Sequence, residues 1–240
     1  MRSREWTLER RASTLVNTVQ GVMASEGRKL FAIEGDGLIT TCRRSAFFSD
    51  DDEFASRDIE VICRREKEIH AIARFREWDT CHGFFTGGRD LVMSADASSQ
   101  ADYECAEMLM DHWGEDDHPL ESWEPLIIFD RLVIAVPDAG IWPALTAAID
   151  KAFKRRGGTL VLKAFPLEWE GAADGRPVGD EPMFARRLSA MRRLYRRKLG
   201  MQDIPENEEG WMWKAVGHPM PPNPTRVGQP EARNLEFEDT

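Results

Sequence analysis

The segment from Leu126 to Val136 constrains the fold more than any other part of the chain, because apolar side chains fill it almost without interruption. A strand of this composition is buried on both faces and therefore lies in the middle of a sheet. The turn-forming residues 137–140 end the strand. Residues 141–153 then place large apolar side chains at every fourth position, which predicts an amphipathic helix.

Two glycines, Gly157 and Gly158, end this helix, and residues 159–163 return as a second apolar strand. A strand, a helix and a strand joined in this way form a unit whose strands are parallel and whose crossover is right-handed. The centre of the chain therefore predicts a sheet with helices packed against it, in the α/β (α+β) class.

Residues on either side of this unit predict further strands. Apolar runs flanking Glu34–Gly37 predict a hairpin over 30–41, and apolar or β-branched patterns predict strands at 58–64, 68–75 and 90–94. Residues 201–204 and 211–214 have the pattern of a closing strand pair. Since one face of a closing strand is buried, we expect either Met212 or the flanking Trp211 and Trp213 to point outward, and exposed tryptophans would indicate a partner surface.

Three further segments have helical spacing. The first is residues 5–23. The second begins after Ser98 or Ser99, either of which could cap it, and ends near Trp113. The third ends before Gly200, and its apolar face comprises Phe184, Leu188, Met191 and Tyr195. From Gly217 onward, five prolines and a charged end predict a loose tail.

Charge is distributed unevenly along the chain. The net charge is −10, yet residues 151–200 contain 13 Lys and Arg against 5 Asp and Glu. A basic segment in an acidic protein indicates either a local anionic partner or a solvated helix face. Nucleic acid is not an expected partner, because the surrounding acidity opposes it and no base-reading motif accompanies the arginines.

Several classes of protein are not expected from this composition. No apolar run reaches 18 residues, so we expect no transmembrane helix and no membrane partner. The four cysteines show no metal-binding or redox spacing, which favours reduced thiols in a cytoplasmic protein. The histidines at 70, 82, 112 and 118 lack the rhythm of metal ligands, and the acidic stretch 111–118 is typical of a solvated loop, so no metal site is expected.

The order strand, turn, helix, strand, helix, closed by Leu194-Tyr195-Arg196-Arg197-Lys198-Leu199-Gly200-Met201, resembles the core of the GNAT superfamily of N-acetyltransferases. The resemblance covers residues 89–216, within a single domain at 1–216 that precedes the tail at 217–240; residues 1–88 have no clear match. It implies a mixed, mainly antiparallel sheet flanked by helices. In the family, the parallel strands corresponding to 126–136 and 159–163 splay apart to open a cleft for acyl-CoA.

The resemblance also implies a cofactor site for acetyl-CoA or another acyl-CoA. The main-chain N–H groups of Val133, Ile134 and Ala135 would polarise the thioester carbonyl. The pyrophosphate would be bound by the loop after the strand and by the start of the helix. The residues of this loop and helix start are Asp138, Ala139, Gly140, Ile141 and Trp142. The basic residues Arg192, Arg196 and 154–156 could offset the anionic cofactor.

The phosphate loop departs from the family pattern, which has an Arg or Gln followed by closely spaced glycines. Here the leading Arg or Gln is missing, the loop is about two residues short, and Asp138 brings negative charge to the phosphate position. Trp142 replaces a small residue, and Pro143 donates no N–H. The alternative is that Asp138 is only a helix cap and that Trp142 fills the groove where CoA would lie.

Tyr195 is the candidate catalytic residue, since a tyrosine at this place in the family can give its proton to the leaving CoA thiolate. The alternative is that Tyr195 only continues the apolar face of its helix. A general base would be a carboxylate, and nothing in the sequence discriminates among four candidates by position: Glu124, Asp130, Glu168 and Glu170.

Two functions follow as expectations. The first is transfer of an acyl group from acyl-CoA to an amine acceptor that the sequence does not identify. The second is a catalytically inactive GNAT-fold protein that binds a protein partner or regulates one, through the strand with Trp211 and Trp213 or through the tail. The sequence leaves the oligomeric state open, and a homodimer is one of the states it allows.

Overall fold

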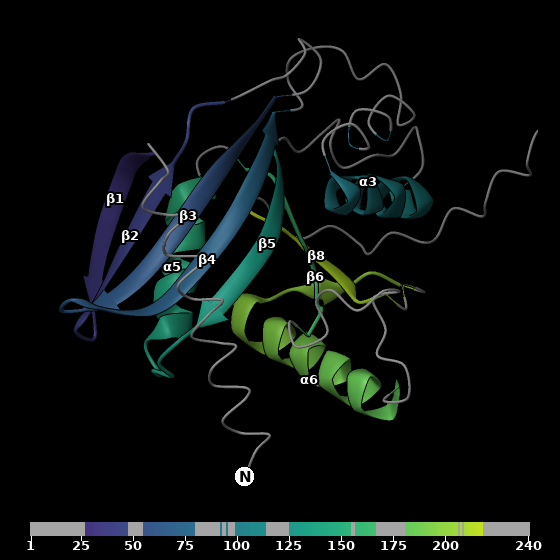
Figure 1. The fold of residues 1–240 in the computed structure, drawn as a ribbon. Helices are drawn as coiled ribbons and strands as arrows, with labels where there is room; N and C mark the ends of the chain where they lie inside the picture. Colours follow the sequence, from purple (N-terminus) through teal and green to yellow (C-terminus); the bar gives the residue numbers. More distant parts are fainter. Residues whose placement is uncertain are drawn as a thin grey trace, which may run out of the picture.

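The computed structural model describes residues 27–47, 55–79, 92, 95, 99–113, 125–154, 157–166, 181–205, 207 and 209–217. Within them, eight strands form one sheet in the order β1-β2-β3-β4-β5-β6-β8-β7, accompanied by three helices (Figure 1). All neighbouring strands are antiparallel except β5 and β6, which are parallel. The expected mixed, mainly antiparallel sheet is therefore confirmed.

The first four strands form a meander of two hairpins. The strands are β1 (Arg28–Gly35), β2 (Leu38–Arg44), β3 (Ala55–Arg65) and β4 (Glu68–Asp79). Both tight turns contain residues with positive φ, Asp36 and Gly37 in the first and Glu66 in the second. Two-residue turns of this kind match the twist of antiparallel strands, which explains the early hairpins.

The central strand-helix-strand unit is confirmed, with β5 at Leu126–Ile134, α5 at Ile141–Phe153 and β6 at Thr159–Lys163. The strand ends two residues earlier than the sequence pattern predicts. The helix α6 (Glu181–Leu199) follows, and the short strand β7 (Gln202–Asp203) pairs with β8 (Trp211–Ala215), as expected for the closing pair.

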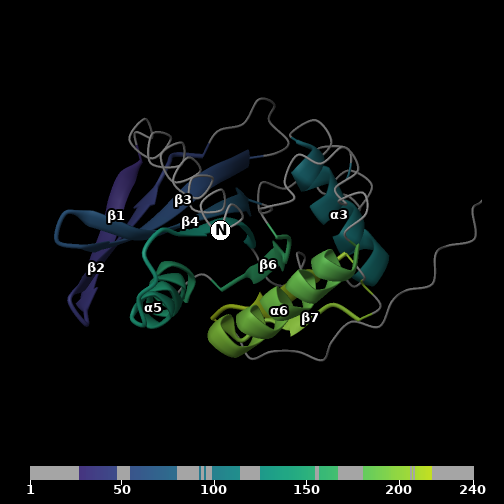
Figure 2. The same ribbon diagram turned by 60° about the horizontal axis from the view of Figure 1, so that its bottom comes forward.

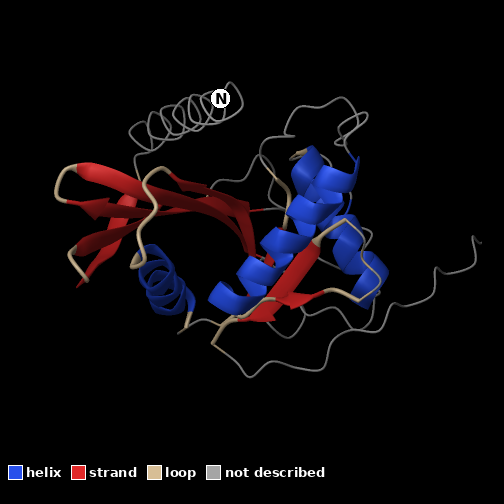
Figure 3. Ribbon diagram, turned by 90° about the horizontal axis from the view of Figure 1, so that it is seen from below, coloured by secondary structure: helices blue, strands red, loops and turns tan. Residues whose placement is uncertain are grey.

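Helices cover both faces of the sheet. One face is buried under α5 and α6, whose Leu145, Ile149 and Tyr195 belong to the same apolar cluster as Phe75 and Phe129 of the sheet. The opposite face packs on α3 (Gln100–Trp113), which Ser99 caps as expected by accepting a hydrogen bond from the Asp102 N–H at 3.2 Å. Figures 2 and 3 show α5 and α6 as neighbours, with α3 set apart from α5.

The expectation that only one face of the closing strand is buried is wrong. Trp211, Met212 and Trp213 are 3%, 0% and 0% exposed, so both faces of β8 are covered. The reason is its place between β6 and β7, where the two tryptophans pack in the α3 cluster and Met212 packs in the cluster under α5 and α6. Trp211 and Trp213 therefore form no exposed partner surface.

Several predicted segments fall outside the described residues. They include the N-terminal helix at 5–23, most of the strand at 90–94 and the tail beyond Gly217. Val92, within the predicted strand, is helical. Among the described helices, none combines the length and the apolar character needed to cross a lipid bilayer.

Gly158 sets the start of β6 against β5, and replacing it is expected to destabilise the fold. It has φ +136°, and an added Cβ would lie 2.5 Å from the carbonyl oxygen of Pro125. Gly158→Ala should therefore lower the free energy of unfolding by about 1–3 kcal/mol, measured by urea denaturation. The matched control is Gly35→Ala, where a Cβ would meet no atom within 4 Å; equal stability of the two variants would contradict this explanation.

Candidate active site

A gap opens between the two parallel strands. β5 and β6 pair over only three positions, Leu126 with Thr159, Ile127 with Leu160 and Ile128 with Val161. Both strands continue beyond these pairs, to Ile134 and Lys163, without pairing to each other. Figure 1 shows the strands close together where they begin and apart where they end. The side of β5 that faces β6 is therefore an open strand edge from residue 129 onward.

A β-bulge lies at the point where the strands separate. Arg74 of β4 pairs with Arg131 and the next residue, Phe75, pairs with Phe129, so Asp130 is left without a partner in the ladder. Such an extra residue bends its strand and increases the local twist, and bulges are common next to active sites. The bulge accounts for the turn of β5 away from β6 and for the exposed position of Asp130.

A small cavity fills the fork between the strands. Its volume is about 60 Å³, and β5, β6 and α6 contribute its lining residues, which are Phe129, Asp130, Arg131, Leu132, Leu162, Lys163, Phe165, Met191 and Tyr195. This volume is enough for about two water molecules at liquid density. The cavity therefore suits a small reacting group, whereas a longer chain would have to lie along the open edge of β5.

Tyr195 reaches this cavity from α6. Its ring packs edge-on against the rings of Phe129 and Trp142, each with a centroid distance of 6.3 Å. Burial raises the pKa of Tyr195 to about 12, so the hydroxyl keeps its proton at neutral pH. In the described part of the chain no group hydrogen-bonds to this hydroxyl, which is therefore available to a ligand.

Two charged residues of the cavity, Lys163 and Asp130, differ in whether they have an ion-pair partner. Lys163 donates to Glu104 at 2.8 Å and lies 3.0 Å from a carboxylate oxygen of Glu209. Burial alone would lower the pKa of Lys163, but these two carboxylates outweigh it and raise the pKa. Asp130, by contrast, has no cationic partner among the described residues. Of the four carboxylates proposed as general base, it is the one that the described residues include.

Some of the main-chain N–H groups at the end of β5 already donate hydrogen bonds within the sheet. The N–H groups of Ala135 and Val136 both donate to the carbonyl oxygen of His70 on β4, at 2.9 and 3.2 Å. Because donors alternate between the two sides of a strand, Val133 directs its N–H to β4 as well, and Ile134 directs its N–H to the open edge. The prediction that Ala135 offers a free donor is therefore wrong, and of the three predicted donors Ile134 has the suitable direction.

Asp138 occupies the anion position at the start of α5. Its Oδ1 accepts from the Gly140 N–H at 2.8 Å, and its Oδ2 accepts from Arg65 Nη2 at 2.8 Å. His70 Nδ1 lies 3.5 Å from the same Oδ2. The hydrogen bond from Arg65, followed by that from Gly140, lowers the pKa of Asp138, so this carboxylate is ionised at neutral pH. The alternative that Asp138 is the helix cap is wrong, because the N-cap of α5 is Gly140 and no side chain caps it; Asp138 instead closes the turn that precedes the helix.

The remaining residues of the predicted phosphate loop follow Asp138 into the first turn of α5. Ala139 is exposed in the turn and Gly140 is buried. The Ile141 N–H donates to the Asp138 carbonyl at 3.3 Å, and the Ile141 side chain is buried in a core cluster. Trp142 is half-buried against the ring of Tyr195 and is not among the residues that line the cavity. The indole therefore borders the site without filling the fork.

The structure thus brings Tyr195 and Asp130 together in the cavity, while the open edge of β5 continues past it to Ile134. Of the predicted loop residues, Trp142 reaches Tyr195. Sequence reasoning missed Arg65, which donates a hydrogen bond to Asp138, and His70, whose ring lies 3.5 Å from the same carboxylate; both come from strands more than sixty residues away in the chain. No local pattern marks either residue, since their role depends on sheet register. Glu124, Glu168 and Glu170 lie outside the described residues.

Metal and thiol chemistry find little support at this site. Among the described residues there is no group of three or more His, Cys, Asp or Glu placed to hold a metal ion. Cys42, Cys63 and Cys105 are buried free thiols, and burial raises the pKa of each, to about 12 for Cys42. Thiols of this kind are poor nucleophiles.

Comparison with known proteins adds no relative: no family model matches the sequence, and no curated protein or solved structure gives a significant match. The assignment of a function therefore depends on the geometry of the cleft.

Proposed function

We propose that this protein has a GNAT-like fold and transfers an acyl group from a pantetheine thioester, in the simplest case acyl-CoA, to an amine. The observation that carries the proposal is the fork between β5 and β6, with a protonated tyrosine directed into it from α6. A pantetheine arm carries amide groups, and these can pair with the open edge of β5 as an added strand would. The thioester would then lie in the cavity.

In this arrangement each group has one task. The amine nitrogen of the acceptor attacks the thioester carbonyl carbon, forming a C–N bond while the C–S bond breaks. Asp130 accepts the proton that the nitrogen loses, and Tyr195 gives its hydroxyl proton to the departing thiolate. Water then returns the proton from Asp130 to the tyrosinate, so the net products are an amide and a free thiol.

Positioning supplies a large part of the expected acceleration. Two reactants held in contact in the correct orientation gain about 7–11 kcal/mol relative to the bimolecular reaction. The Ile134 N–H faces the open edge beyond the cavity and can donate to the pantetheine arm. Positioning the arm in this way does not require the N–H groups of Ala135 and Val136, which donate to the carbonyl oxygen of His70.

One observation favours a second candidate function, that of a GNAT-shaped protein without catalysis. The start of α5, where the resemblance places the pyrophosphate of CoA, is occupied by the ion pair of Asp138 with Arg65, and Asp138 also takes the Gly140 N–H. A protein of this kind would act by binding a partner. The two functions differ in whether a thioester enters the cleft.

Thermal denaturation with two ligands separates these functions. A ligand at a hundred times its dissociation constant stabilises the folded state by about 2.7 kcal/mol. We expect millimolar S-acetylpantetheine or acetyl-CoA to raise the melting temperature, with free pantetheine as the control for the acyl group. If neither thioester changes the melting temperature, the acyl-transfer proposal is overturned and the binding function remains.

A further inference from the structure

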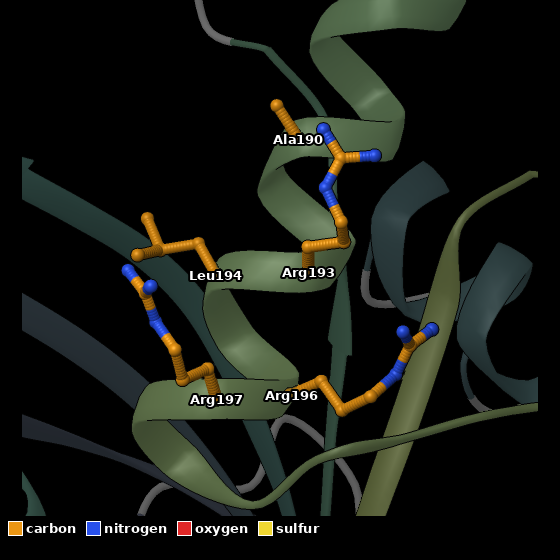
Figure 4. A pocket seen from close by; sticks show the side chains of 5 residues that line it. All are labelled: Ala190, Arg193, Leu194, Arg196 and Arg197. Atoms are coloured by element: carbon orange, nitrogen blue, oxygen red, sulfur yellow. The ribbon is translucent and has the colours of Figure 1, made fainter.

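The outer side of α6 is a basic surface beside the cleft. The helix contains seven Lys and Arg and one carboxylate, Glu181. Near its C-terminal end a shallow groove of about 530 Å³ is lined by Ala190, Arg193, Leu194, Arg196 and Arg197, which we call the basic groove. Figure 4 shows Arg193 and Arg196 extending to one side of the helix and Arg197 to the other.

Among the described residues, Arg196 is the one arginine of the basic groove that has a carboxylate partner. Asp203 of β7 forms ion pairs with Arg192 and Arg196. Arg193 donates only to the hydroxyl of Ser189, at 2.8 Å, and no carboxylate among the described residues pairs with Arg193 or Arg197. The groove therefore presents charge that an acidic surface can meet.

The basic groove belongs to the same helical turns as the candidate catalytic tyrosine. Tyr195 precedes Arg196 and Arg197 and faces inward, against Phe129 and Trp142. The carbonyl oxygen of Lys198 accepts a hydrogen bond from Thr146 of α5 at 3.3 Å. The basic end of α6 thus lies beside α5.

The usual place for a nucleotide pyrophosphate, the start of α5, already holds the ionised Asp138. Pro143 has no N–H, and the N–H groups of Ala135, Val136, Gly140 and Ile141 are occupied. A donor whose pantetheine arm is not followed by a nucleotide does not need these occupied donors. Such a donor is phosphopantetheine attached to a protein.

Resting on the acyl-transfer function above, we propose that the acyl donor is a thioester on the phosphopantetheine arm of an acidic carrier protein, which docks on the basic groove of α6. The arm passes from the docked carrier into the fork between β5 and β6. The reaction is the same exchange, in which the acyl carbon moves from sulfur to nitrogen. The carrier leaves with a free thiol that has received its proton from Tyr195.

The test compares three thioesters by calorimetric titration and by thermal denaturation: S-acetylpantetheine, acetyl-CoA and a small acidic acyl carrier protein bearing acetyl-phosphopantetheine. We expect the carrier to bind at least about tenfold more tightly than S-acetylpantetheine, with an affinity that falls as salt rises. Arg193→Glu/Arg197→Glu should remove this advantage and leave the affinity for S-acetylpantetheine unchanged. Arg28→Glu/Lys29→Glu is the matched control, because it makes the same charge change at exposed positions of the edge strand β1.

A second variant tests the blocked nucleotide position. Asp138→Asn keeps a side-chain oxygen that can accept the hydrogen bond from the Gly140 N–H, and it removes the negative charge. The ratio of the affinity for acetyl-CoA to that for S-acetylpantetheine should rise by about tenfold. An unchanged ratio would show that Asp138 does not exclude the nucleotide.

The remaining outcomes are distinguishable. Tight binding of S-acetylpantetheine with no advantage for the carrier overturns the carrier proposal and leaves the acyl-transfer function intact. Failure of both S-acetylpantetheine and acetyl-CoA to bind overturns the acyl-transfer function and, with it, the carrier proposal, whether or not the carrier binds. Equal binding of the carrier without its arm, or of an RNA of similar charge, overturns the carrier proposal in favour of a general polyanion surface.

Discussion

Tyr195→Phe is expected to lower the rate of acyl transfer by about 10²–10⁴-fold, the range for loss of a general acid. The substitution removes only the hydroxyl, so the ring contacts with Phe129 and Trp142 remain and the thioester should still bind. The measurement is release of free thiol from the acetyl donor in the presence of a panel of amines. Binding is followed separately by titration with S-acetylpantetheine.

The chain provides a matched control for this substitution. It contains two tyrosines, and the other one, Tyr103, is on α3, where its hydroxyl donates to Glu107 away from the cleft. Tyr103→Phe should leave turnover and binding unchanged. If Tyr195→Phe retains full turnover, Tyr195 is a packing residue, as the apolar face of its helix also allows.

The largest effect on stability is expected from the buried ion pair between β3 and β4. Arg57 donates through Nε to Glu77 Oε2 at 2.9 Å and through a second N–H to Oε1, and the two residues are 6% and 1% exposed. Arg57→Met removes the guanidinium and leaves a buried carboxylate without it. The free energy of unfolding should fall by about 3–5 kcal/mol, measured as a lower urea midpoint.

Removing both charges provides the control. In Arg57→Met/Glu77→Leu no buried carboxylate remains, so the double variant should be close to the wild type or more stable. Comparable destabilisation of the single and double variants would mean that the pair contributes through packing, including the contact of Arg57 with the ring of Phe47 at 4.0 Å.

The sequence predicted the elements that depend on local patterns. The apolar run at 126–134 and the spacing of Leu145, Ile149 and Phe153 were sufficient for β5 and α5, because burial requires those periods. The hairpin turn was predicted at Glu34–Gly37 from its turn-forming residues between two apolar runs, and the structure places it at Asp36 and Gly37, both with positive φ.

Features that depend on register or on distant residues could not be predicted. The bulge at Asp130 exists because β4 and β5 shift by one residue, and nothing in either segment alone marks that shift. The ion pair of Asp138 depends on Arg65 at the end of β3, which is distant from Asp138 in the sequence. Burial of both faces of β8 follows from its position between β6 and β7, whereas the prediction assumed a strand covered on one face only.

The central claim is that a pantetheine thioester lies in the fork between β5 and β6. Amide shift mapping by nuclear magnetic resonance, during titration with S-acetylpantetheine, tests it most directly. We predict that the largest changes occur at residues 129–134, at Lys163 and at Tyr195, while β1 and β2 are unaffected. Saturable binding whose changes are confined to other parts of the molecule, or the absence of any change at millimolar thioester, would contradict the account.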